Sequence, residues 1–353
     1  MPSPLETWQF RTGYDGTLCD VTFDGKTEKW QYGDTKLYSP FKLDLEKAVE
    51  RHNNVVKELR DRLSKSKVDV SEAVAFRDDC RAQKWTGPTS GKAPGHVQAN
   101  LVILPSHYKD DFQSFCSLNP QACPLLETID STVDGQHHLR LRLVSTVVAP
   151  GADILTDLPK YVIHYNGESK EVLSAAAAAD QSLPENVAAT GLTGFIFGCS
   201  FSWEDKLAQA GVPPRHMVEG KNVAMYRTNI PNKVAGPFGG VLVVSMRPYK
   251  LNQISRVIEV TSKYPLAHGR PMHIGDGRMI GVDVTKPPDY GDRITLEKDD
   301  IYVFWCCGVT SATGALSAHP ELLITHSPGH MLVLDITNDM LNGVGDFDNL
   351  ISF

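Results

Sequence analysis

The sequence predicts an α+β or mixed α/β protein, with mixed β-sheets, flanking helices and two intertwined subdomains behind an N-terminal extension. Short apolar runs bounded by Gly and Pro are typical of strands, and they alternate with segments of helical periodicity. Because the alternation is irregular, we do not expect a barrel of equal units. The chain of 353 residues is long for one core, and its composition changes near residue 75. We therefore divide it into an extension, residues 1–75, and a main domain, residues 76–353.

The extension carries two patterns. Over residues 8–38, aromatic and polar residues alternate between Asp-Gly and Gly-Asp turn signals, which predicts a small β-meander. Over residues 43–65, Leu and Val recur at helical spacing and predict an amphipathic helix. We expect this helix to pack on the core or on a second subunit of a homo-oligomer; a coiled-coil arm is the alternative.

Periodicity and turn signals define the elements that follow the extension. In order, we expect a helix at 75–83, a strand at 100–104, a helix at 108–116, a strand over 139–150 and a hairpin of 161–165 with 168–173. The Gly/Pro-rich stretch 86–95 lacks the spacing of a P-loop, so we expect a rigid loop there and no nucleotide. The alanine run 175–179 predicts a solvated helix or a variable loop.

From residue 194 onward, strands give way to loops rich in reactive side chains. The expected elements are strands at 194–199, 241–246 and 301–306, helices at 203–210 and 251–264, and a strand pair of 322–325 with 332–336. Six of the twelve histidines and three of the seven cysteines lie between 194 and 335. Rigid strands that expose such loops are where enzymes place their chemistry, so this region favours an enzyme over a binding scaffold.

Composition argues against several classes of protein. The formal net charge of −7 disfavours a nucleic-acid surface. No apolar stretch is long enough to span a membrane, and the first residues lack the pattern of a secretory signal. Seven cysteines at irregular spacing fit reduced thiols in a reducing compartment. We expect a cytoplasmic protein whose partner is a small molecule.

Cys199 and Ser200 are candidate substrate-binding residues. They precede a predicted helix whose segment from Ser202 to Asp205 has the pattern of a capping box. Free N–H groups at a helix N-terminus stabilise negative charge, which suggests an anion hole for a carboxylate or a thiolate of lowered pKa. The alternative is a buried Cys-Ser pair that closes a tight turn.

A second candidate group lies between residues 215 and 229. His216 and Glu219 are candidates for proton transfer, since imidazole and carboxylate are the usual proton carriers near neutral pH. Arg227 and Asn229 are candidates for substrate binding, because the planar fork of Arg matches a carboxylate. The alternative is a solvated loop held by ion pairs.

Arg247 follows the apolar run 241–246 and precedes Pro248, and we expect it at the mouth of a core strand. Because an unpaired buried cation is very unfavourable, its guanidinium should meet either a ligand or an internal carboxylate. We favour a ligand, and we expect Arg227 and Arg247 to face one pocket.

The histidine loops supply the remaining candidates. Pro328 and Gly329 break the helix that a His-x-x-x-His zinc pair requires, so we expect proton transfer and no metal. We expect His326 or His330 of the last loop to share the pocket with Cys199 and Cys307. The candidates are His326, His330 and Cys307 for catalysis, and His273 and Thr310 for substrate binding.

Long sequence words in these loops resemble the D-glutamate cyclase family, whose bacterial members are commonly called hydro-lyases. The words follow in order over roughly residues 76–340: WTGPT (85–89), VQANL (97–101), FCSLNPQACPLLE (115–127), TDLPKY (156–161), GCSFSWE (198–204), MYRTN (225–229), VSMRP (244–248), HGRPMHIGD (268–276), DYGD (289–292), FWCCGVT (304–310) and THSPGHM (325–331). The chain departs from the family in its long extension, in the alanine-rich stretch 174–180, and at Ser311-Ala312, where Pro-Gln is usual.

The resemblance implies closure of D-glutamate to 5-oxo-D-proline with loss of water and without a cofactor. Such a reaction needs a cation for the α-carboxylate, a base for the ammonium, an acid for the departing hydroxyl and donors for the oxyanion. The resemblance to this family also leaves a mitochondrial location open. A dehydratase or cyclase acting on another carboxylate-bearing metabolite of specialised metabolism is the first alternative. A non-catalytic binding protein is the second, and the retained histidines weigh against it.

Overall fold

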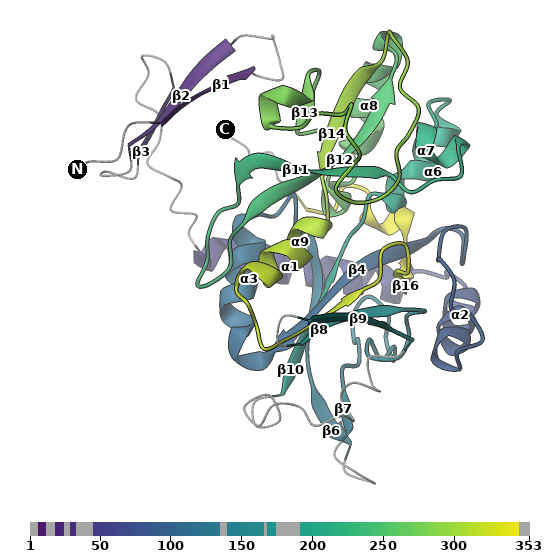
Figure 1. The fold of residues 1–353 in the computed structure, drawn as a ribbon. Helices are drawn as coiled ribbons and strands as arrows, with labels where there is room; N and C mark the ends of the chain where they lie inside the picture. The colour runs from purple at the N-terminus through teal and green to yellow at the C-terminus, as the bar shows by residue number, and fades with distance from the viewer. Residues whose placement is uncertain are drawn as a thin grey trace.

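The structure of the chain is a computed structural model, and it describes residues 6–11, 18–24, 29–32, 45–134, 140–165, 168–173 and 191–345. Its body contains a seven-stranded and a four-stranded sheet with helices packed around them (Figure 1). The α+β class expected from the sequence is confirmed. Every strand pair in the described residues is antiparallel, so these sheets are not mixed parallel and antiparallel sheets as we expected.

The seven-stranded sheet has β4 near its centre. Its strands, in spatial order, are β5 (Leu125–Asp130), β10 (Leu192–Phe197), β4 (His96–Pro105), β15 (Leu322–His326), β8 (Tyr161–Tyr165) and β9 (Glu168–Val172), with β16 (Leu332–Thr337) paired to β4. All ten residues of β4 are buried. Alternate side chains, such as Leu101 and Val102, enter two different apolar clusters, so this strand separates two parts of the core.

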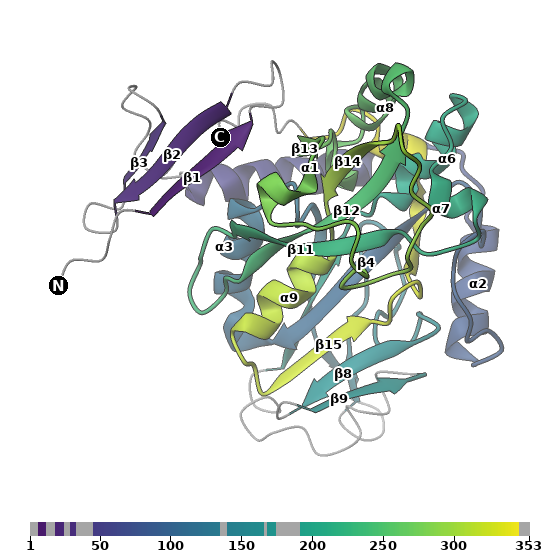
Figure 2. The ribbon, with the colours of Figure 1, turned by 45° about the horizontal axis from the view of Figure 1, so that its top comes forward.

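The four-stranded sheet is built between β10 and β15 in the chain. Its spatial order is β11 (Ala224–Pro231), β12 (Val241–Tyr249), β14 (Ile301–Cys306) and β13 (His273–Ile274). After β14 the chain returns to the first sheet through α9 (Val309–Ser317), which lies between β11 and β15 in Figure 2 and contacts β12, β4 and β15. The two sheets are therefore interleaved along the chain.

The other helices cover these sheets. They are α1 (Leu45–Lys65), α2 (Ser71–Arg81), α3 (Lys109–Leu118), α6 (Phe201–Gln209), α7 (Arg215–Val218) and α8 (Ile254–Thr261), with 3-10 turns at Ser106–Tyr108, Leu251–Gln253, Pro265–Ala267, Gly277–Ile280 and Asn338–Leu341. Two small sheets are added by β1 (Glu6–Arg11), β2 (Leu18–Asp24) and β3 (Lys29–Tyr32), and by β6 (Thr132–Asp134) and β7 (Arg140–Arg142). No helix in the described ranges is long and apolar enough to cross a membrane.

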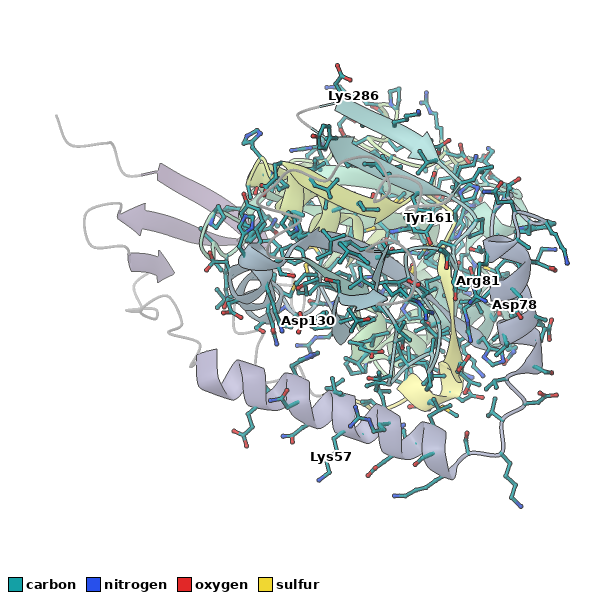
Figure 3. The ribbon with its side chains drawn as sticks, turned by 90° about the horizontal axis from the view of Figure 1, so that it is seen from below. Lys57, Asp78, Arg81, Asp130, Tyr161 and Lys286 are labelled. Atoms are coloured by element: carbon teal, nitrogen blue, oxygen red, sulfur yellow. The ribbon has the colours of Figure 1, made fainter. Side chains whose placement is uncertain are left out.

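Most of the expected elements are confirmed. The meander exists as β1–β2–β3, and the expected helix at 43–65 is α1, which lies along the body while Lys57 points away from it (Figure 3). Leu59 on α1 is fully buried in the core, so docking on the same chain is the correct alternative. The Asn-Gly turn at 166–167 and the alanine run 175–179 lie outside the described residues.

The long strand expected over 139–150 is wrong. Only β7 is a strand, because the backbone amides of Thr146, Val147 and Val148 donate to the buried carboxylate of Glu127 at 2.8–3.2 Å and are not free to form a sheet. The expected pair of 322–325 with 332–336 is also wrong. β15 and β16 lie one after the other along the same edge of β4.

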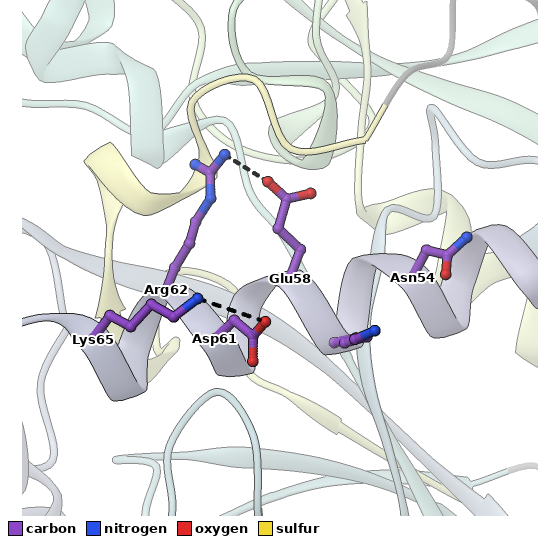
Figure 4. Close-up of a pocket in the computed structure, with 6 residues that line it drawn as sticks. Asn54, Glu58, Asp61, Arg62 and Lys65 are labelled. Carbon is purple, nitrogen blue, oxygen red and sulfur yellow. Dashed lines mark hydrogen bonds and ion pairs between the residues drawn. The ribbon is translucent and has the colours of Figure 1, made fainter.

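Arg62 anchors α1 to the C-terminal part of the described chain. Its Nη1 donates to the carbonyl oxygens of Met340 and Asn342, both at 2.9 Å, and its Nη2 bonds Glu58 at 2.6 Å (Figure 4). Lys65, by contrast, reaches only Asp61 on the same helix, at 3.9 Å. The shallow hollow that these side chains line is on the helix surface, and none of the candidate site residues lines it.

We expect Arg62→Ala to lower the free energy of unfolding by about 1–2 kcal/mol, because two hydrogen bonds from a charged donor are lost at a partly exposed position. Lys65→Ala is the matched control and should change stability by less than about 0.5 kcal/mol. Urea unfolding of both variants measures the difference. Equal stabilities would show that the bonds from Arg62 do not hold α1 in place.

Candidate active site

Two strand-to-helix turns, one from each sheet, meet at β4. In the first, β10 leads through Gly198 into α6; in the second, β14 leads through Gly308 into α9. A Cβ on Gly198 would lie 1.6 Å from the carbonyl oxygen of Leu266, and one on Gly308 would lie 2.3 Å from Asn100 Nδ2, so both close approaches require glycine. Asn100 also donates from Nδ2 to the Gly198 carbonyl at 3.0 Å. This buried amide of β4 therefore contacts both turns.

Each turn places a thiol at the start of a helix. The amide of Phe201 donates to Cys199, and the amide of Val309 donates to Cys307. Burial nevertheless raises the pKa of Cys199 to about 12 and that of Cys307 to about 11. The thiolate of lowered pKa expected at Cys199 is therefore wrong, because desolvation outweighs the helix N-terminus. Cys307, which is half-buried, also contacts Met225 sulfur to sulfur at 3.4 Å.

Arg247 lies fully inside the core and not at a strand mouth, because β12 continues through Pro248 to Tyr249. Its Nη2 donates to Glu204 at 2.5 Å and to the Ser200 hydroxyl at 3.0 Å, while Nη1 donates to the Ser245 hydroxyl at 3.0 Å. Of the two expected partners, the structure shows the internal carboxylate.

Two tryptophans enclose this ion pair. The guanidinium carbon of Arg247 is 4.6 Å from the ring centroid of Trp203 and 5.2 Å from that of Trp305. Both rings are fully buried, and their centroids are 5.3 Å apart. Aromatic faces stabilise a cation while they exclude water, so the charges of this cluster interact strongly.

The capping box expected from Ser202 to Asp205 is wrong, because α6 begins at Phe201 and Ser200 precedes it without a side-chain cap. The Glu204 carboxylate instead faces Arg247 and His216, whose Nε2 lies 3.2 Å from Glu204 Oε1. Burial alone would raise the pKa of Glu204, but the neighbouring Arg247 and His216 lower it to about 2. A buried carboxylate thus stays ionised between a guanidinium and an imidazole.

Several polar atoms beside this ion cluster have no protein partner in the part of the chain that the structure describes. They include Arg247 Nε, the Tyr249 hydroxyl and Trp305 Nε1, and neither ring nitrogen of His216 makes an aligned hydrogen bond. The rings of Tyr249 and Trp305 are 6.5 Å apart. Buried polar atoms are nearly always satisfied in proteins, so this group marks a place where water or a ligand completes the hydrogen bonds.

His326 ends β15 at the same end of the sheet as the first turn. Burial lowers its pKa to about 4, so the ring is neutral near pH 7. Its Nδ1 lies 3.1 Å from the amide nitrogen of Leu101. Nδ1 also lies 3.4 Å from the Leu101 carbonyl oxygen. Because the amide contact is shorter and an amide can only donate, we assign Nδ1 as the acceptor and place the ring proton on Nε2. His330 lies in the following turn, with Nδ1 2.9 Å from the carbonyl oxygen of Pro328.

One face of the four-stranded sheet carries an exposed arginine and, farther along, the ion cluster. Arg227 pairs with Val243 in the register of β11 and β12, so it shares the face of Ser245 and Arg247. Arg227 is exposed, while Arg247 is fully buried. With a rise of about 3.3 Å per residue and strands about 4.8 Å apart, the Cα atoms of the two arginines are separated by about 14 Å. Cys307, next to Met225, lies at this face.

The other predicted site residues have different surroundings, which makes the candidate group smaller than the sequence suggested. Glu219 pairs with Lys221 at 2.8 Å and accepts from the amide of Thr295. His273 pairs with Phe304, whose side chain enters the core on the opposite face of the sheet from Arg247. Thr310 hydrogen-bonds the backbone of Val243 and ties α9 to β12, and exposed Asn229 lies against Gly281.

Sequence reasoning missed Asn100, Glu204 and Ser245 as site residues. Each lies inside a sequence word already noted for other residues. The need of a buried arginine for a carboxylate partner is the signal that could have pointed to Glu204. In the described ranges, no three His, Cys, Asp or Glu side chains are grouped so that they could hold a metal ion.

The chain is similar to known bacterial proteins over most of its length. A family model described as D-glutamate cyclase matches residues 193–335. A protein of Stutzerimonas stutzeri named "Putative hydro-lyase" is 42% identical over 274 residues, which cover 77% of this chain and 96% of the relative. Relatives with the same type of name come from Geobacillus kaustophilus, 41% identical over 75% of this chain and 94% of the relative, and Bacillus licheniformis, 44% identical over 73% and 92%.

The matched family region contains both strand-to-helix turns, the whole Arg247–Glu204–His216 cluster and both histidines of the last loop. Asn100, on β4, lies outside it. Identity above 40% over nearly the full length of these relatives extends the similarity well beyond that region. The chain therefore belongs to the D-glutamate cyclase family.

Proposed function

We propose that the protein is a cofactor-independent hydro-lyase that closes D-glutamate to 5-oxo-D-proline. In this reaction the amine nitrogen attacks the γ-carboxyl carbon, a C–N bond forms, and one carboxyl oxygen leaves as water. Two protons of the ammonium group end on that oxygen, so the site must take protons from the nitrogen and deliver them to the oxygen. The relatives named as hydro-lyases support the reaction class.

The observation that carries the proposal is the buried Arg247–Glu204–His216 cluster beside the Cys199–Ser200 turn. It combines a fixed cation, an ionised carboxylate and an imidazole in a place that excludes water. Charges fixed in advance in such a place stabilise developing charge more strongly than they would in water.

We assign roles according to the surroundings of each group. Exposed Arg227 is the group that fixes the α-carboxylate at the entrance of the sheet face. His216, held beside an ionised carboxylate, accepts a proton from the ammonium group and, once protonated, delivers it to the departing oxygen. The neutral ring of His326 stabilises that oxygen by a hydrogen bond from Nε2. Holding the amine near the γ-carboxyl carbon accelerates closure, since such proximity supplies up to about 7–11 kcal/mol in favourable cases.

A diverged dehydratase or cyclase for another carboxylate is the second candidate. One observation favours it: Ser311 stands in the first turn of α9, where the family usually has proline, and its hydroxyl donates to the Gly308 carbonyl at 2.7 Å. The first turn of α9 therefore differs in sequence from the usual pattern of the family.

Purified protein incubated with D-glutamate and no ATP should form 5-oxo-D-proline, detected by NMR and by loss of one water in mass spectrometry. L-glutamate under the same conditions is the control and should react at least about tenfold more slowly, a difference of only about 1.4 kcal/mol in barrier height. Unchanged D-glutamate after long incubation of well-folded protein would contradict the cyclase assignment and favour the second candidate.

A further inference from the structure

Two serine hydroxyls approach Arg247 from different elements. Ser200 comes from the turn before α6 and Ser245 from the middle of β12. Each Oγ is 3.0 Å from a different terminal nitrogen of the guanidinium, and both side chains are buried. One arginine therefore fixes two hydroxyls that are far apart in the sequence.

The direction of these hydrogen bonds follows from the chemistry of arginine. A guanidinium has donors and no acceptor, so the oxygens of Ser200 and Ser245 must accept from it. The hydroxyl hydrogen of each serine then points elsewhere, and no acceptor contacts either one within the described residues. A buried donor without an acceptor is unfavourable, so the pair requires an acceptor that the described chain does not supply.

We infer that Ser200 and Ser245 bind one carboxylate group of the substrate through their hydroxyl hydrogens. A carboxylate offers two oxygens, one for each hydroxyl, and donors that are polarised by a cation favour a negatively charged acceptor. The guanidinium of Arg247 already pairs with the Glu204 carboxylate at 2.5 Å. Arg247 therefore acts on the substrate through the two serine hydroxyls, as a positioning residue. This inference rests on the proposed function for the identity of the substrate, and it adds Ser245 to the site.

The same sheet face defines the class of substrate. Arg227 lies opposite Val243, two residues before Ser245 on β12, which places the Cα atoms of Arg227 and Ser245 about 8 Å apart. Their side chains share one face, with Arg227 exposed and Ser245 buried. A molecule that carries two carboxylates separated by a short carbon chain can therefore contact Arg227 at the outer end and the serine pair at the inner end. The site is specific for dicarboxylates of about the length of glutarate.

The test measures binding of glutarate, which lacks an amine and therefore cannot cyclise. Isothermal titration should show that Ser245→Ala weakens glutarate binding by roughly 10- to 100-fold, the effect of one lost hydrogen bond to a charged group. Ser245→Thr keeps the hydroxyl and should restore most of the affinity. Thr261→Val, which removes a buried hydroxyl that already donates to the Val257 carbonyl within α8, is the control and should bind glutarate like the wild type.

Turnover of D-glutamate provides the second readout. Because Arg227 takes the α-carboxylate, the serine pair holds the γ-carboxyl group that reacts, so Ser245→Ala should lower kcat/KM by at least the factor lost in glutarate binding. A structural defect would instead lower the Tm and the fraction of active protein, and threonine at position 245 would not restore kcat/KM.

The outcomes separate this inference from the proposed function. Normal glutarate affinity in well-folded Ser245→Ala protein overturns the inference, even if the wild type cyclises D-glutamate. A wild type that binds glutarate through Ser245 but leaves D-glutamate unchanged supports the inference and contradicts the cyclase assignment. A wild type that binds no dicarboxylate overturns the inference as well.

Discussion

Replacing Arg247 by Met is expected to lower the free energy of unfolding by about 3–5 kcal/mol, because it leaves the Glu204 carboxylate buried without its cation. Arg247 is fully buried, and its removal also takes away the donors to Ser200 and Ser245. Methionine fills a similar volume between the two tryptophans, so loss of packing contributes little. Urea unfolding followed by circular dichroism measures the change.

The double variant Arg247→Met/Glu204→Gln is the control for this prediction. Removing both charges should destabilise the protein less than the sum of the two single changes, because no uncompensated ion remains in the core. Additive effects would show that Arg247 and Glu204 do not stabilise each other. A large loss in Arg247→Met that the second substitution does not reduce would point to packing and not to charge.

The lowered pKa of Glu204 also predicts how the free energy of unfolding depends on pH. Its folded pKa of about 2 lies below the ordinary value of 4.5, so the unfolded chain binds the proton more readily than the folded chain does. The stabilising contribution is therefore fully present above pH 4.5 and is lost as the pH falls from there toward about 2. The urea midpoint of Glu204→Gln should accordingly change less than that of the wild type over this interval.

Local sequence patterns predicted the elements well because their causes are local. Apolar periodicity placed α1 and β14, and the runs flanking residues 166–167 gave the hairpin of β8 and β9. The strand expected over 139–150 failed for a reason that no local pattern carries. Its amides are satisfied by Glu127, which precedes them on β5 and becomes their partner only in the folded chain.

The candidate site was predicted in its parts but not in its connections. Arg247, His216 and Ser200 were all candidates, yet the residue that joins the first two, Glu204, was noted only as part of the segment expected to form a helix cap. Its role depends on which side chains the two sheets bring together across the core. The pKa of Cys199 shows the same limit, since the helix N-terminus is visible in the sequence and the depth of burial is not.

His326→Ala is expected to lower kcat by roughly 10²–10³-fold, the range for loss of one hydrogen-bond donor to a developing oxyanion. The neutral ring, with Nδ1 occupied by the Leu101 amide, has a donor at Nε2, which suits a hydrogen bond that stabilises the departing oxygen. Because burial lowers the pKa of His326 to about 4, the ring stays neutral from about pH 5 upward. The loss of rate should therefore be similar across the neutral and mildly alkaline range.

Three variants decide whether this loss reflects chemistry. His107→Ala removes a half-exposed histidine beside Glu321 and should retain the wild-type rate. His326→Gln keeps an N–H donor and should recover part of the lost kcat, which a purely structural role would not predict. If His326→Ala combined with His330→Ala still turns over at full rate, neither histidine acts in the reaction. The departing oxygen must then be stabilised from the ion cluster around Glu204 and His216, the other group with donors next to the Cys199–Ser200 turn.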